Sequence, residues 1–475
     1  MTSPADVRRI ARQFPSYRDY VDDALFHPAW GYYSTGQVRF GEGGHYDTFP
    51  LALAPLFGRM LATYAFRFWQ RQGEPPRFEI GELGAGNGQL CLDTLIAVSQ
   101  GARQERAWKR FAAAFRYRII ERSRALVERQ RATLGPLAAS VTWTRADLSQ
   151  RAVRGAPFAP CGVVFANEVL DCLSHHKVVP RPDGPGVVYV VPTLTAPHRG
   201  RRPHTRAGNR ATAAGSVPRP IPRRALGAVL ADARLRPHVR FEEVTLPLRC
   251  VPELYHFMQR YYPELFYMHT FKPYFACPAI PRLVGNAARL YDHSECLWID
   301  YGDTAAFHLV TAENQRVFAG PPRSGASVFR DPGRDDITFF VDFTVVAAAA
   351  ETAGLGVTFF GPQAELAHRS GVEFDRAARD GILHYRALGW MLAVAGVGPE
   401  SAWRQGGLTW SARDGKGGSL RNYVNKAVAE FVGKRRSHFK LMILAPVQNV
   451  TRAAKRPPSP SATRGRAPRG AGARG

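Results

Sequence analysis

The chain has 475 residues and a formal net charge of +25, so it can bury a large core and is basic enough to suggest a nucleic-acid partner. However, residues 195–224 and 446–475 hold 15 Arg and Lys with no acidic residue, in Pro-, Gly- and Arg-rich sequence that cannot form a core. The remainder is only modestly basic, so the charge does not by itself indicate nucleic-acid binding. The six cysteines form no C-x-x-C pair, and no apolar run approaches the roughly 18 residues of a membrane-spanning helix. The sequence therefore predicts reduced thiols, no metal site and no membrane span.

The first 75 residues are predicted to form a cap of helices and loops. One helix follows Thr2, and Ser16 is the expected N-cap of a second. Residues 27–34 and 40–48 then combine many glycines and aromatic residues outside any regular element. This composition predicts a loop that folds over a ligand, and a surface loop with aromatic anchors is the alternative.

A glycine-rich loop follows a short apolar strand that covers residues 78–83. Glycine occupies every second position from 84 to 88, so the backbone can turn sharply and approach a ligand ahead of the next helix. A dinucleotide fold needs the pattern G-x-G-x-x-G, but here Gln89 stands where the third glycine belongs, and the acid precedes the loop. This acid-x-G-x-G-x-G pattern resembles motif I of class I S-adenosylmethionine-dependent methyltransferases, although an ordinary strand-to-helix turn stays open. The predicted cofactor contacts are Glu82, Gly84, Ala85, Gly86 and Gly88.

Two later strands are predicted to place acids beside the same cofactor. The strand at 115–121 ends in Glu121. In a Rossmann-like sheet the carboxyl end of the second strand lies beside the ribose, and a carboxylate there can accept hydrogen bonds from the ribose hydroxyls. The alternative role for Glu121 is to cap the following helix. The third strand, at 141–148, contains Asp147, which is predicted to face the adenine amino group.

A buried strand at 161–166 leads into the polar sequence Asn167-Glu168-Val169-Leu170-Asp171. Because ligands bind at the carboxyl edge of open α/β sheets, Asn167, Glu168 and Asp171 are candidate catalytic residues. Helix capping by Asn167 and Glu168 is the alternative.

Several segments together resemble the MidA family: HPAWGYY, FGEGG, APLFGRMLA, ELGAGNG and ANEVLD, over roughly residues 15–180 and more thinly over 295–445. The resemblance implies an S-adenosylmethionine-dependent methyltransferase that methylates protein arginine, and a complex I subunit is the implied partner because mitochondrial members are complex I assembly factors. It predicts a Rossmann-like α/β fold with a seven-stranded sheet, helices on both faces and N-terminal and central insertions. The predicted compartment is the cytoplasm, or the mitochondrial matrix in a eukaryote.

An arginine acceptor gives the carboxylates a chemical role, because they can hold a guanidinium by bidentate hydrogen bonds and take its proton on alkylation. Glu168 is the first candidate and Asp171 the second. The predicted substrate contacts are Tyr32, Tyr33, Asp47, His176 and Asp300. Of these, His176 matches a His-Lys pair that is common in the family, and Asp300 belongs to a predicted strand, 297–303, that resembles the family's D-Y-G segment and should lie beside the strand at 161–166.

Two loops depart from the family pattern. Residues 44–51 read GHYDTFPL where the family usually has G-D-F-x-T-x-P-E, and residues 315–321 lack part of an Arg-Gly-rich run. Both loops are expected to face the substrate, so a cofactor-binding scaffold without catalysis is an alternative function. A nicotinamide dehydrogenase and a nucleic-acid methyltransferase are further alternatives.

The predicted organisation has six parts. They are an N-terminal cap (1–75), a cofactor-binding core (76–194), a basic insert (195–224), a helical insertion (225–295), the remaining core with a substrate-facing lid (296–445) and a disordered basic tail (446–475). A final strand near 438–444 is expected as an antiparallel edge of the sheet.

Overall fold

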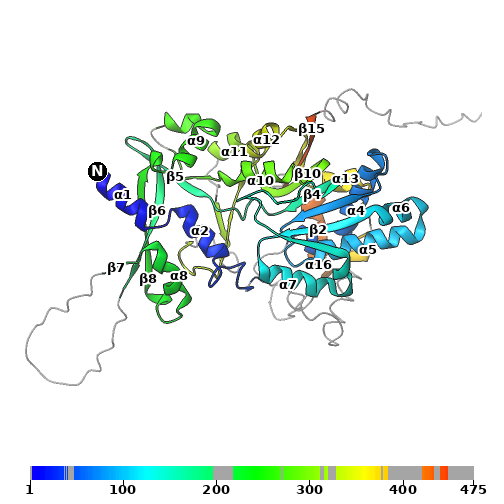
Figure 1. Cartoon of the computed structure of the whole chain (residues 1–475), viewed down its shortest axis with the longest axis horizontal. Helices are drawn as coiled ribbons and strands as arrows, with labels where there is room; N and C mark the ends of the chain where they lie inside the picture. The colour runs from blue at the N-terminus through cyan, green and yellow to red at the C-terminus, as the bar shows by residue number, and fades with distance from the viewer. Residues whose placement is uncertain are drawn as a thin grey trace, which may run out of the picture.

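The computed structural model describes residues 3–36, 38, 40, 48–195, 218–268, 271–310, 315–318, 328–375, 378–382, 420–432 and 439–447 (Figure 1). Within these ranges, no helix combines the length and the apolar character that a membrane crossing would require. The described residues build two large sheets that lie side by side, one mainly parallel and one antiparallel (Figure 1), and a two-stranded sheet of β11 (Gln315–Phe318) and β12 (Asp336–Phe339).

The larger sheet has the strand order β14-β15-β10-β4-β1-β2-β3. Strands β1 to β4 and β10 run parallel, whereas β15 runs antiparallel to both β10 and β14. A short strand, β13, pairs with the end of β10 as an eighth member. The bounds are β1 Phe78–Leu83, β2 Phe115–Glu121, β3 Val141–Arg145, β4 Ala159–Asn167, β10 Tyr291–Asp303, β13 Val341–Asp342, β14 Leu355–Pro362 and β15 Phe439–Pro446.

These strands confirm the predicted α/β sheet, including the adjacency of the 161–166 and 297–303 strands, which are β4 and β10. The predicted place of the last strand is wrong. β15 is antiparallel, as expected, but it lies between β10 and β14, so β14 forms the edge. The sequence did not indicate β14 because residues 355–362, LGVTFFGP, contain two glycines and are only partly buried.

Side chains alternate between the two faces of this sheet, so each face has its own apolar core. On one face, Phe78 and Ile80 of β1 belong to a core shared with α4 (Leu56–Arg71), α5 (Gln89–Gln104), α6 (Arg106–Ala114) and α16 (Leu420–Val432). On the other face, Leu83 belongs to a core shared with α10 (Ala279–Ala287) and α12 (Phe343–Thr352). Helices therefore cover both faces, as predicted.

The second sheet has five antiparallel strands in the order β7-β6-β5-β9, with β8 also paired to β6. Their bounds are β5 His176–Arg181, β6 Gly184–Leu194, β7 Arg219–Pro220, β8 Val239–Pro247 and β9 Tyr274–Ala276. The structure thus differs from the predicted organisation, in which 176–194 belonged to the cofactor-binding core and 225–295 was helical. Two residues, Pro182 and Asp183, connect β5 to β6, and so short a link allows only antiparallel pairing.

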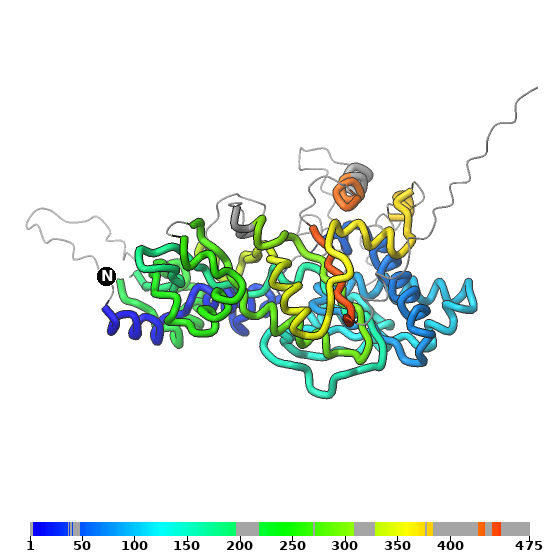
Figure 2. The backbone as a smooth tube through the Cα atoms, turned by 90° about the horizontal axis from the view of Figure 1, so that it is seen from above, coloured from blue at the N-terminus to red at the C-terminus, as the bar shows by residue number. Residues whose placement is uncertain are grey.

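The N-terminal residues pack against both sheets. Helix α1 (Pro4–Gln13) follows Thr2 as predicted, and α2 (Tyr17–Phe26) begins after Ser16, which caps it in a reciprocal capping box with Asp19. Helix α2 packs in a third apolar core with β6 and with β12 (Asp336–Phe339). Figure 2 shows the N-terminus on the side of the second sheet. The described residues also form α7 (Arg124–Leu134), α8 (Arg223–Ala231) and a 3-10 helix at Arg236–His238.

Candidate functional site

The glycine-rich loop has a backbone that requires glycine. Gly84, Gly86 and Gly88 have φ angles of +62°, +54° and +87°. A Cβ at Gly84 would lie 3.1 Å from a methyl group of Val169, and one at Gly88 would lie 3.1 Å from the Cα of Gln130. Helix α5 begins immediately after Gly88, so its free N–H groups face the loop. The loop is therefore a close-fitting turn between β1 and α5.

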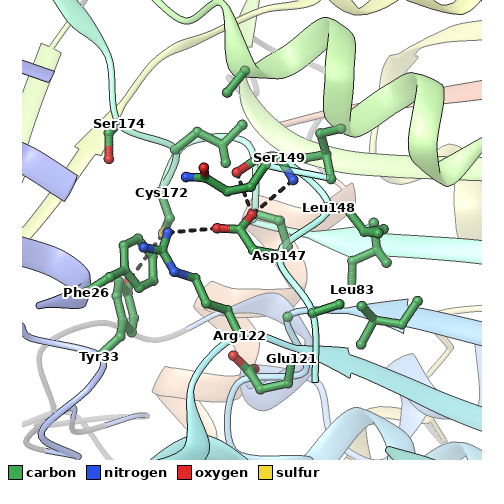
Figure 3. Close-up of a pocket in the computed structure, with 18 of the residues that line it drawn as sticks. Phe26, Tyr33, Leu83, Glu121, Arg122, Asp147, Leu148, Ser149, Cys172 and Ser174 are labelled. Carbon is green, nitrogen blue, oxygen red and sulfur yellow. Dashed lines mark hydrogen bonds and ion pairs between the residues drawn. The ribbon is translucent and has the colours of Figure 1, made fainter. Parts of the chain in front are cut away.

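A pocket opens beside this loop at the carboxyl ends of four parallel strands (Figure 3). β1 has β2 on one side and β4 on the other, so the strand order reverses at β1, and open α/β sheets bind ligands at such a point. The lining combines the strand ends with the N-terminal cap and α10. It includes Phe26, Tyr33, Phe40, Leu83, Gly84, Gly86, Glu121, Arg122, Asp147, Ser149, Glu168, Cys172 and Leu283.

Glu121 lies in the pocket wall at the end of β2 and is only 6% exposed. Its carboxylate accepts hydrogen bonds from the Ser123 backbone N–H at 2.8 Å and from Gln130 Nε2 at 3.1 Å. Gln130 also donates to the Gly86 carbonyl and accepts from the indole N–H of Trp143. Burial raises the Glu121 pKa to about 7. Gln130 therefore fixes Glu121, the glycine loop and β3 relative to one another.

Asp147 follows β3 and lies in the same wall. One carboxylate oxygen accepts from the backbone N–H and the hydroxyl of Ser149, and the other forms an ion pair with Arg122 at 3.1 Å. Arg122 also pairs with Asp22 of α2 and lies 3.9 Å above the Phe26 ring (Figure 3). Arg122 thus ties the N-terminal cap to the end of β3.

Glu168 directly follows β4 and has a φ angle of +52°, a left-handed conformation that is unfavourable for a residue with a side chain. Its backbone N–H donates to Ile299 of β10, which holds this turn in place. The side chain accepts a hydrogen bond from Asn167 Nδ2 at 3.0 Å, and the residue lines the pocket. The turn after β4 therefore holds a strained carboxylate at the pocket wall.

Three further carboxyl groups lie buried behind this wall: Asp171, Asp300 and Asp336, each at most 4% exposed. Asp300 accepts from the backbone N–H groups of Leu170, Asp171 and Tyr301, so it shapes the turn after β4. No Lys or Arg in the described residues forms an ion pair with any of the three. Burial raises the pKa of Asp171 to about 6 and of Asp336 to about 7, and it raises the pKa of Asp300 as well.

Tyr33 connects the pocket with these buried acids. It lines the pocket, and its hydroxyl donates to Asp336 at 2.8 Å and lies 3.1 Å from the Cys172 sulfur. Phe40 lines the pocket as well and packs near Gly86. Arg129 of α7 donates to the Val38 and Gly36 carbonyls and so holds the loop against the larger sheet. Of the aromatic loop, Tyr33 and Phe40 therefore line the cavity, whereas residues 41–47 lie outside the described residues, and folding over a ligand stays a prediction.

The structure gathers only some of the predicted site residues around the pocket. Its lining includes Gly84, Gly86, Glu121, Asp147, Glu168 and Tyr33. Residues that contribute indirectly, through the loop or through the turn after β4, are Ala85, Gly88, Asn167, Asp171 and Asp300.

The other predicted residues lie elsewhere. Glu82 points to the opposite face of the sheet, where it accepts from Tyr117 at 2.7 Å, and burial raises its pKa to about 7. Tyr32 is fully buried in the third core. His176 is buried in β5, where burial lowers its pKa to about 3. None of these three lines the pocket. Asp47 lies outside the described residues.

Sequence reasoning missed Gln130 and Arg122, which organise the side of the pocket formed by β2 and β3. Gln130 is a fully buried polar residue in an otherwise ordinary amphipathic helix, and Arg122 directly follows Glu121. Only the position of Arg122 after a strand-end acid could have indicated it. Among the described residues, no group of three or more His, Cys, Asp or Glu side chains is arranged to hold a metal ion.

Comparisons with known proteins agree with this geometry. Residues 60–362 match the model of a family described as S-adenosyl-L-methionine-dependent methyltransferases. The chain is 30% identical over 185 residues to the mouse protein arginine methyltransferase NDUFAF7, mitochondrial, and 34% identical over 82 residues to its Drosophila melanogaster homolog. These matches cover 36% and 17% of this chain, and 41% and 18% of the relatives, which is well under two thirds of their length.

Two solved structures share the fold over nearly the whole chain. A COG1565 superfamily member from Burkholderia thailandensis, bound to S-adenosyl-homocysteine, has a TM-score of 0.58 at 20% identity. The native crystal structure of a COG1565 superfamily protein from the same organism has a TM-score of 0.55 at 19% identity. Each match covers 94% of both chains.

Proposed function

Because the chain belongs to the S-adenosyl-L-methionine-dependent methyltransferase family, whose model matches residues 60–362, we propose that it transfers a methyl group to the guanidinium of a protein arginine. The cofactor and the enzyme class follow from the family. The arginine acceptor is the finer proposal, and it rests on the printed names of the partial relatives and on the carboxyl groups around the pocket.

The residues of the pocket fit the cofactor. Gly84 and Gly86 line the pocket, so no side chain separates the loop backbone from a ligand at these two positions. Glu121 is positioned to accept from ribose hydroxyls, and the Asp147 carboxylate lies in the wall for an adenine amino group. S-adenosylmethionine, when bound, supplies an electrophilic methyl group. The chain's own residues must then align the acceptor, exclude water and remove a proton.

The observation that carries the arginine proposal is the set of carboxyl groups at the end of β4. Glu168 lines the pocket, and Asp171, Asp300 and Asp336 lie behind it with no ion pair to a Lys or Arg in the described part of the chain. Buried carboxyls without a cation are costly, and a guanidinium delivered to this wall would offset that cost. An acidic wall thus favours a cationic acceptor over a neutral one.

We assign Glu168 the direct role, because its carboxylate reaches the pocket wall. It is placed to hold the guanidinium by charge-assisted hydrogen bonds and to accept the proton that the nitrogen loses on alkylation. Asp171 and Asp300 keep the turn after β4 in shape and add negative charge, and Tyr33 excludes water from the side of the cap. Asn167 positions Glu168 through its 3.0 Å hydrogen bond.

Methylation of an arginine-containing peptide by the Glu168→Gln variant tests this proposal. We expect kcat to fall roughly a hundredfold or more, as is usual on loss of a general base, while calorimetry shows unchanged S-adenosylmethionine affinity. Glu128→Gln on α7 is the matched control, because Glu128 is exposed and only pairs with Arg124. If the wild type binds the cofactor but methylates no arginine in a peptide library, the acceptor proposal is wrong and a cofactor-binding scaffold becomes the better description.

Partner and compartment remain predictions. The names of the relatives include the word mitochondrial, which supports a mitochondrial location for a eukaryotic source; the matrix follows only from the family resemblance. A complex I subunit as substrate follows only from the family resemblance. Immunoprecipitation of the tagged protein, followed by mass spectrometry of methylated arginines, would identify the acceptor.

A further inference from the structure

A second cavity lies between the N-terminal cap and the second sheet, and it shares no lining residue with the cofactor pocket. Its volume is about 690 Å³. The walls come from the loop after α2, from the 3-10 helix and the start of β8, and from the segment that leads into β12. The residues that matter below are Trp30, Arg236, Arg240, Arg330, Asp331 and Arg334.

The walls of this cavity are firmly held. Tyr20 of α2 donates a buried hydrogen bond to the Val328 carbonyl at 3.0 Å. Gly333, with a φ of +75°, packs so closely on Trp30 that a Cβ would collide with the Trp30 carbonyl oxygen. Phe329 stacks on Phe241 of β8, with ring centroids 5.3 Å apart. The segment at 328–334 therefore lies in a fixed place against α2 and β8.

Positive charge in the cavity lining exceeds negative charge. Four arginines and one aspartate line it, and in the described residues none of the four guanidinium groups forms an ion pair. Arg236 donates to the Leu230 carbonyl, and Arg240 donates to the Pro237 and Val239 carbonyls. Burial first, and then the neighbouring Arg334, lowers the pKa of Arg236. The cavity therefore holds an excess of positive charge, which the carboxylates of Asp331, near Arg236, and Asp335, near Arg330, offset only in part.

An unsatisfied donor lies in the same wall. Trp30 is only 2% exposed, and its indole N–H has no hydrogen-bond partner. Buried indole N–H groups usually find an acceptor. The Trp30 N–H is covered by protein, so the guanidinium groups are the donors that a ligand in the cavity can reach. A neutral apolar ligand would leave them without an acceptor, whereas an oxyanion offers one.

We propose that this cavity binds an oxyanion through Arg330, Arg334 and Arg236, as the phosphate group of a small molecule or the carboxylates of an acidic peptide. Guanidinium groups present paired donors that match both kinds of oxyanion bidentately. The size of the cavity and the faces of Phe241 and Phe329 leave room for the body that carries the charge. The site is separate from methyl transfer, so it stands or falls independently of the arginine proposal.

Calorimetric titration of the full-length protein at low salt, with pyrophosphate and separately with a hexaglutamate peptide, tests the proposal. We expect at least one probe to bind, and the double variant Arg330→Gln/Arg334→Gln to weaken that binding about tenfold or more. Both arginines are exposed, so the fold should survive, and unchanged S-adenosylmethionine binding would verify this.

The control is Arg103→Gln/Arg106→Gln, which removes the same charge from exposed positions on α5 and α6. We expect it to change the affinity less than twofold. Binding of pyrophosphate alone would assign the site to phosphates, and binding of the peptide alone would assign it to acidic polypeptides. If neither probe binds the wild type, or if the control pair weakens binding as much as the cavity pair, the proposal is overturned.

Discussion

The carboxyl groups on the two sides of the pocket beside the glycine-rich loop differ in their hydrogen-bond and ion-pair partners. On the side of β2 and β3, Glu121 and Asp147 are held by neighbouring donors, including Gln130 and the cation Arg122. On the side of β4, Asp171 has a carboxylate oxygen with no hydrogen-bond partner, and Asp336 accepts from the neutral hydroxyl of Tyr33. On the first side the carboxylates are already fixed in place to accept hydrogen bonds from a ligand. On the second side the acids have no cationic partner among the described residues. The proposed function accounts for this difference, because it requires a preorganised cofactor site beside an acceptor site that a cationic substrate completes.

The largest expected effect is on the cofactor side, from Gly86→Val. Gly86 has a φ of +54° and lines the pocket, so a branched side chain would both strain the loop and fill the cradle. We expect S-adenosylmethionine affinity, measured by calorimetry, to fall at least a hundredfold. Gly184→Val is the control, because Gly184 also has a positive φ but has open space around it, far from the pocket. Equal loss of binding in both variants would mean that the effect is general destabilisation.

A smaller effect is expected from Glu121→Gln, which keeps the shape of the side chain but removes its charge. Hydrogen bonds to a charged group contribute roughly 1.5–3 kcal/mol, so cofactor affinity should fall between about tenfold and a hundredfold. Adenine-only ligands should lose little affinity, because the ribose hydroxyls are the predicted donors. If adenine and S-adenosylmethionine lose affinity equally, Glu121 supports the fold of the pocket and does not contact the ribose.

The smallest effect concerns pH and the acceptor side. The Asp336 pKa is raised to about 7 and that of Asp171 to about 6, so both groups gain negative charge as the pH rises from 6 to 8. An arginine acceptor stays protonated throughout this range. The KM for an arginine peptide should therefore fall as the pH rises, by about tenfold at most. The control is Asp336→Asn, which should flatten the upper part of the profile. A KM that is independent of pH in the wild type would separate these acids from acceptor binding.

Prediction from sequence succeeded for residues whose place at the pocket follows from a local sequence pattern. The glycine loop and the strand-end acids Glu121 and Asp147 could be placed because turn chemistry and strand order locate them without tertiary information. It failed for Glu82 and His176, whose side chains point away from the pocket. Alternation along a strand shows which residues share a face of the sheet. Which of the two faces lines the pocket depends on the tertiary fold, so the sequence alone could not give it. Gln130 was missed because its partners come from three other segments.

The amino-acid pattern was enough to predict the parallel α/β core, the glycine loop and the class of cofactor, since these depend on period, spacing and backbone freedom. Three features could be recognised in the folded structure alone: the second sheet, the place of β15 inside the larger sheet, and the buried acids behind Tyr33. Each of these depends on contacts between residues far apart in the chain, such as Tyr33 with Asp336. Such pairings depend on how whole surfaces pack together, and a short stretch of sequence contains no information about that packing.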